Sequence, residues 1–99
     1  MALETKLARH AVHDKLAAQL KTAEAALSTL KARAEKVKAN VELKAAANLI
    51  AKKPAMQQKL VDLKNAGKDR WERVRQDVET HIADFEKSVN DLNARIKQG

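Results

Sequence analysis

Residues 16–41 read LAAQLKTAEAALSTLKARAEKVKANV, and this stretch decides the predicted fold. Its apolar side chains recur at alternating steps of four and three residues, the a/d spacing of a coiled coil, which places them along one side of a long helix. No Gly or Pro interrupts it. Such a helix is not stable alone in water, so the stripe must be buried against a partner. The stripe consists of Leu16, Leu20, Ala23, Leu27, Leu30, Ala34, Val37 and Val41.

The composition of the 99 residues is typical of a helical protein. Hydrophobic residues make up 44% of the chain and aromatic residues only 2%, so the apolar content is mostly Ala, Leu and Val. Because alanine buries little area, the core is expected to be thin, which favours self-association. Two Gly and one Pro indicate long helices rather than a sheet. We therefore expect one all-α domain over residues 1–99.

Several classes of protein are excluded or disfavoured by the composition. The absence of cysteine excludes disulfides, thiolate metal sites and cysteine nucleophiles. Residues 1–30 lack the apolar segment of a signal peptide, and no apolar run reaches the length of a membrane span. We therefore expect a cytoplasmic protein with no membrane span. The net charge of +7 favours acidic partners, such as nucleic acid, anionic lipid or acidic protein.

Pro54 marks the predicted turn. Proline inside a helix removes a hydrogen bond and clashes with the preceding turn, whereas the first position of a new helix tolerates it. We expect one helix over residues 3–52 and a second over residues 54–98, folded back as an antiparallel hairpin. A continuous helix kinked at Pro54 is an alternative. Gly67 offers a further break, because Asp69 and Glu72 after it have capping-box spacing.

The second predicted helix also carries an apolar stripe, from Met56 to Ile96. The predicted hairpin brings Trp71 near Ala34 and Val89 near Leu16. Two helices leave much of their apolar surface half covered, so we expect the hairpins to assemble as dimers or tetramers into a coiled-coil bundle. The expected core or oligomer contacts are Leu16, Leu20, Leu27, Leu30, Val37, Val41, Trp71, Val74, Val78, Ile82, Phe85, Val89 and Leu92.

One segment departs from the plain helical pattern: Lys59-Leu60-Val61-Asp62-Leu63-Lys64, followed by Gly67, Asp69, Trp71 and Glu72. It resembles a recurring stretch in small bacterial coiled-coil proteins of uncharacterised function, where a Lys-Leu-x-x-Leu-Lys run leads into a Gly/Ser-Asp-x-Trp-Glu segment. The similarity covers about half of the chain. This chain differs from the family at Pro54, where a helix former is usual, and at Ile82, near where a second Trp is common. The resemblance implies a helical bacterial protein and supplies no activity.

The sequence contains no convincing catalytic or metal-binding pattern. His10 and His13 stand three residues apart beside Asp14, which on a helix places two imidazoles and a carboxylate on one side. Structural zinc normally needs four ligands, and His81 is distant in the predicted hairpin, so we expect interface or solvent-exposed histidines and no metal or cofactor. Paired carboxylates in an apolar setting, a Gly-rich phosphate loop and a Ser/His/Asp arrangement are all missing. We expect no enzymatic activity.

Basic residues gather in two groups, which the predicted hairpin brings to similar heights on neighbouring helices. Together they would form a belt able to neutralise several phosphates, although interleaved acidic residues could pair with them instead. The expected function is a non-enzymatic structural or protein-interaction module that self-associates. The alternative is binding of nucleic acid or another polyanion without sequence specificity. The candidate polyanion-binding residues are Lys31, Arg33, Lys36, Lys38, Lys68, Arg70, Arg73 and Arg75.

Overall fold

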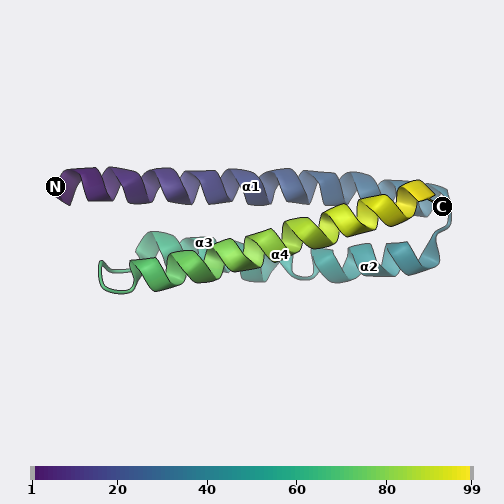
Figure 1. The fold of residues 1–99 in the computed structure, drawn as a ribbon. Coiled ribbons are helices and arrows are strands. Elements are labelled where there is room, and N and C mark those ends of the chain that lie inside the picture. Colours follow the sequence, from purple (N-terminus) through teal and green to yellow (C-terminus); the bar gives the residue numbers. More distant parts are fainter. Residues whose placement is uncertain (1, 99) are drawn as a thin grey trace.

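The computed structural model describes the backbone of residues 2–98 and the side chains of residues 8–96. In that range it contains four helices and no strand, which confirms the predicted all-α class (Figure 1). The molecule is a rod with extents of 54 × 18 × 15 Å. The helices are α1 (Ala2–Lys36), α2 (Asn40–Ile50), α3 (Lys53–Asn65) and α4 (Trp71–Gln98).

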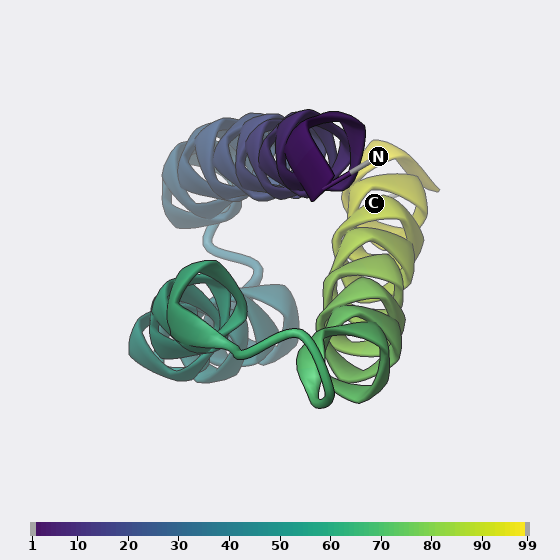
Figure 2. The same ribbon diagram turned by 90° about the vertical axis from the view of Figure 1, so that its left-hand side faces the viewer.

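The helices form three arms rather than the two of the predicted hairpin. α1 runs along the rod, α2 and α3 return end to end, and α4 runs again in the direction of α1 (Figure 1). Figure 2, which views the rod from one end, shows the three arms on different sides of a common centre. α1 packs against α2, α3 and α4, and α4 packs against α2 and α3. The predicted antiparallel pairing of the first and last segments is therefore wrong, because they run in the same direction.

The first predicted helix ends about 16 residues early, at Lys36 instead of residue 52. Lys38 adopts a left-handed conformation with φ of 58°. The Ala39 N–H donates to the Ala34 carbonyl at 2.9 Å, and the Lys38 N–H donates to the Glu35 carbonyl at 3.3 Å. This pair of hydrogen bonds is the Schellman motif, which satisfies the last carbonyls of a helix and turns the chain away. Glycine usually occupies the left-handed position, so the sequence lacks the common signal for this turn.

Pro54 does not reverse the chain, and the predicted turn there is wrong. α2 ends at Ile50 and α3 begins at Lys53, so Pro54 lies in the first turn of α3, where its missing N–H costs nothing. The two helices continue in the same direction (Figure 1), which is close to the alternative of a kinked helix. The second reversal follows α3 at residues 66–70, where the Gly67 carbonyl accepts hydrogen bonds from Arg70 N–H at 3.0 Å and Trp71 N–H at 2.9 Å.

All three arms contribute to one apolar core. The stripe of α1 is buried from Leu16 to Ala34, as its spacing predicts. Trp71 and Val74 at the start of α4 are half-buried and pack against this core. No polar or charged side chain within residues 8–96 is buried. α2 and α3 supply Ala46, Leu49, Met56, Leu60 and Leu63, and α4 supplies Val78, Ile82, Phe85, Val89, Leu92 and Ile96.

Two predicted core residues lie outside the core of the single chain. Val37 is 59% exposed and Val41 is 71% exposed. Val37 belongs to the turn that closes α1, and Val41 lies in the first turn of α2, so neither continues the stripe. A coiled-coil spacing that is regular in the sequence therefore stops at Ala34, where the helix itself is about to end.

Candidate anion-binding site

The two basic clusters occupy opposite ends of the 54 Å rod. Lys31, Arg33 and Lys36 lie near the end of α1, and Lys38 lies in the turn that follows. The other cluster lies in and after the α3–α4 turn, which Figure 1 shows at the far end. The predicted belt of both clusters is therefore wrong, because the chain reverses before and after Pro54 rather than at it. That second cluster consists of Lys68, Arg70, Arg73 and Arg75.

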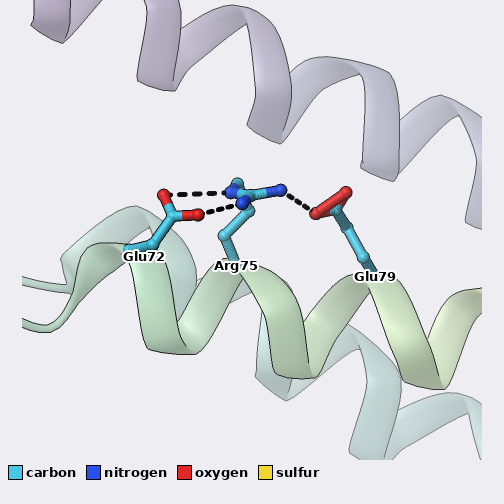
Figure 3. A network of polar contacts seen from close by, with 3 residues as sticks. All are labelled: Glu72, Arg75 and Glu79. Atoms are coloured by element: carbon cyan, nitrogen blue, oxygen red, sulfur yellow. Dashed lines mark hydrogen bonds and ion pairs between the residues drawn. The ribbon is translucent and has the colours of Figure 1, made fainter.

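The Arg75 side chain is held by contacts within α4 and is only partly exposed. Its guanidinium group hydrogen-bonds Glu72 on one side and Glu79 on the other, all on α4 (Figure 3). The same group lies 5.8 Å from the centroid of the Trp71 ring, within cation–π distance. The hydrogen bond from Arg75 lowers the pKa of Glu72, and the same bond raises the pKa of Arg75. Because these two carboxylates already accept hydrogen bonds from the guanidinium group, Arg75 has few donors left for a phosphate.

Most other predicted polyanion-binding residues have no carboxylate partner. Lys31 is paired weakly, with its Nζ 4.0 Å from Glu35 Oε1. The remaining cations are exposed and form no ion pair with any side chain of residues 8–96. They can therefore approach an external anion without first breaking an internal contact. These residues are Arg33, Lys36 and Lys38 at one end, and Lys68, Arg70 and Arg73 at the other.

A pocket of about 240 Å³ opens at the α3–α4 end of the rod. It forms because α4 runs parallel to α1, which brings the start of α4 beside the first part of α1. Sequence reasoning missed it, since the predicted hairpin placed Trp71 beside Ala34, far along α1. We call this the basic pocket, and its lining residues are Arg9, His10, His13, Leu63, Lys64, Ala66 and Trp71.

The walls of the basic pocket differ in chemistry. α1 contributes Arg9, His10 and His13 to the lining, and α3 contributes Lys64. The His13 side chain is 24% exposed, and its Nδ1 lies 3.3 Å from the Asp14 carboxylate. The lining also includes two apolar residues, the half-buried Trp71 and the buried Leu63. This arrangement can bind a ligand that combines an anionic group with a flat apolar group.

The three histidines lie on two helices, His10 and His13 on α1 and His81 on α4. Across residues 8–96, no three His, Asp or Glu side chains converge as metal ligands would. His81, the remaining histidine, lies elsewhere on α4, where its Nδ1 contacts the Asp77 carbonyl at 2.7 Å. His10 and His13 both line the basic pocket.

Polar contacts between helices hold the end of the rod around the pocket. The Lys59 Nζ lies 2.7 Å from Asp77 Oδ2 and joins α3 to α4. The hydrogen bond from Lys59 lowers the pKa of Asp77, with a smaller contribution from the charge of His81. The Gln57 Nε2 donates to Glu24 Oε2 at 3.0 Å and joins α3 to α1. Each arm is thus tied to a neighbour within about three turns of the pocket.

No family model matches the sequence, and neither a curated protein nor a solved structure matches it. Among the helices of residues 2–98, none combines the length and the apolarity that crossing a bilayer requires. We therefore infer function from the geometry and charge of the two ends of the rod.

Proposed function

We propose that this chain is a non-enzymatic helical module that binds nucleic acid through phosphate contacts, without sequence specificity, at the α3–α4 end. One observation carries the proposal: Lys68, Arg70 and Arg73 are exposed without a carboxylate partner among the described side chains, at the same end as Arg9 and Lys64 of the basic pocket. Cations that neutralise phosphates release condensed counterions, which drives binding without reading the bases.

Self-association through apolar contacts is the second candidate. The exposed Val37 and Val41 favour it, since both are apolar side chains at the α1–α2 end that the chain itself leaves uncovered. The stripes that motivate a coiled-coil oligomer, however, are buried within one chain. Two valines also offer far less area than the ~1,200 Å² of a typical stable interface. Assembly into dimers or tetramers remains a prediction. The core is already covered within one chain and does not require such assembly.

The first experiment compares the two ends of the rod at equal change of charge. Binding of a labelled oligonucleotide is followed by fluorescence anisotropy over a salt series. One triple variant carries Lys68→Gln, Arg70→Gln and Arg73→Gln, and its matched control carries Lys31→Gln, Arg33→Gln and Lys36→Gln. Because a single-strand slope is about −0.7 per phosphate contact, losing three contacts should reduce its magnitude by about 2.

We expect the first variant to lose at least about tenfold in affinity at low salt and the control to lose less than about threefold. Circular dichroism verifies that both variants remain helical. Equal losses would contradict the placement at the α3–α4 end, because they would mean that overall charge alone governs binding. Absence of binding by the unmodified chain at low salt would sink the proposal, as would binding to anionic vesicles in preference to nucleic acid.

The second candidate is tested by measuring mass. Light scattering of the unmodified chain is compared with that of a Val37→Asp, Val41→Asp variant. Self-association through these valines predicts an oligomer that the variant converts to a monomer. A monomer in both cases would exclude this interface.

A further inference from the structure

We propose that the basic pocket receives one unpaired nucleotide, so that the α3–α4 end selects single-stranded over double-stranded nucleic acid. This inference rests on the proposed function and specifies that the bound nucleic acid is single-stranded.

The cationic wall supplies the contacts for phosphate. The groups of Arg9, His10, His13 and Lys64 come from two helices and line the same opening. Arginine offers a planar fork of donors suited to phosphate oxygens, while lysine contributes a compact charge. Lys68 and Arg70 lie in the turn between Ala66 and Trp71, both of which line the pocket. Arg70 itself lines a neighbouring pocket between α3 and α4. The cations inside the basic pocket are therefore those of α1 and Lys64.

The apolar wall supplies a surface for the base. The half-buried Trp71 lines the pocket and offers its indole, whereas Leu63 is only 1% exposed and closes the pocket toward the core. Aromatic side chains bind bases of any sequence, because every base has a flat π-face. The guanidinium of Arg75 lies 5.8 Å from the indole centroid and is itself held by Glu72 and Glu79. The indole is thus in cation–π contact with a side chain of its own helix.

The pocket is small. Its volume of about 240 Å³ lies below the ~300–1,000 Å³ typical of sites for drug-sized ligands. A single base fits this scale. In a duplex the bases are stacked inside the helix, and reaching a recess in a protein requires a base to leave the stack, which costs free energy. An unpaired strand does not have to meet that cost.

Trp71 allows a direct test, because it is the only tryptophan in the chain. The unmodified protein is titrated with an unlabelled thymidine oligonucleotide and with a duplex of the same length, and intrinsic fluorescence is recorded. We expect the single strand to quench Trp71 and to bind at least about tenfold more tightly than the duplex at the same salt concentration. The duplex should bind without quenching.

A pair of variants then assigns the preference to the pocket. The Arg9→Gln, Lys64→Gln variant should lose at least about tenfold in single-strand affinity while its duplex affinity changes less than about threefold. A matched control, Lys21→Gln with Lys87→Gln, removes the same charge from exposed positions outside the pocket. It should keep both the quenching and the preference for the single strand.

The outcomes separate this inference from the proposed function. Salt-dependent binding with equal affinity for both forms and no quenching overturns the inference and leaves the function intact. Quenching by a free mononucleotide as strong as that by the strand also overturns it, since the pocket would then be a small-molecule site. No binding of either form overturns both proposals.

Discussion

The α1–α2 turn and the α3–α4 turn reverse the chain by different means. The first uses Lys38 in a left-handed conformation, with φ of 58°. The second contains Gly67, which does not have a positive φ. Of the two glycines in the chain, neither is in the turn whose backbone favours glycine. A glycine in a sequence therefore indicates where a turn is tolerated, and not which turn needs the unusual backbone.

The two ends also differ in how far their apolar side chains are exposed to solvent. At the α1–α2 end, Val37 and Val41 face solvent. At the α3–α4 end, Leu63 is buried and Trp71 forms a wall of the basic pocket. Both ends carry exposed Lys and Arg, so positive charge alone does not distinguish them. The basic pocket distinguishes the α3–α4 end from the α1–α2 end.

The largest difference between the two ends should appear when one apolar side chain at each end is truncated. Leu63→Ala should lower the free energy of unfolding by about 2–5 kcal/mol, because it removes buried methyl groups and leaves a cavity. Val37→Ala should change it by less than about 0.5 kcal/mol, because Val37 is already 59% exposed. Urea denaturation measures both values. A large cost for Val37→Ala would show that this side chain is buried in an assembly.

The Lys38→Gly variant should be more stable than the unmodified chain, by about 1 kcal/mol. A side chain in the left-handed region costs roughly 1–2 kcal/mol, and glycine avoids this at some cost in unfolded-state entropy. For a domain of this size, the melting temperature should rise by about 4–8 °C. Lys31→Gly, at an exposed position inside α1, is the control and should be destabilising, since glycine is a poor helix former. A destabilised Lys38→Gly variant would contradict the Schellman geometry.

A smaller gain is expected from Gly67→Ala. Gly67 has no positive φ, and nothing lies within 4 Å of the position that a Cβ would occupy. Alanine should therefore fit without strain and stabilise the fold by about 0.4–1 kcal/mol, by restricting the unfolded chain. Thermal unfolding followed by circular dichroism tests this. Destabilisation would mean that the turn needs a backbone conformation that alanine cannot adopt.

The smallest effect concerns the ion pair between α3 and α4 near the basic pocket. Lys59 lowers the pKa of Asp77, so this pair contributes stability above the ordinary pKa of an aspartate and loses it as pH falls through the lowered value. Lys59→Gln should raise the pKa of Asp77 toward its ordinary value and reduce the loss of stability in acid. Titration of the Asp77 carboxyl by NMR measures the shift. An unchanged pKa would exclude Lys59 as the cause.

The sequence predicts the helices of this molecule better than its turns. Leu16 to Ala34 and Val78 to Ile96 are buried as their spacing predicts, because a stripe of apolar side chains must be covered whichever partner covers it. The turn after α1 carries neither Gly nor Pro. The N-cap of α2 is Ala39, which makes no side-chain capping hydrogen bond, so no capping residue marks the start of that helix either. Pro54 begins a helix without reversing the chain, and sequence alone does not separate these two roles.

The basic pocket could not be predicted from any local pattern in the sequence. Arg9, His10, His13 and Trp71 are each visible in the sequence, yet they meet only if the chain reverses twice between them. One reversal places Trp71 near Ala34, and two place it near His13. The missed Schellman turn at Lys38 thus accounts for both the wrong topology and the missed site.

An odd number of arms has a mechanical consequence. Since α1 and α4 run in the same direction, Ala2 and Gln98 lie at opposite poles of the 54 Å rod (Figure 1). A tension applied between those poles would load the helices lengthwise, so that they slide past one another in shear instead of peeling apart one turn at a time. In a two-arm hairpin both ends would lie at one pole, and the same tension would unzip it.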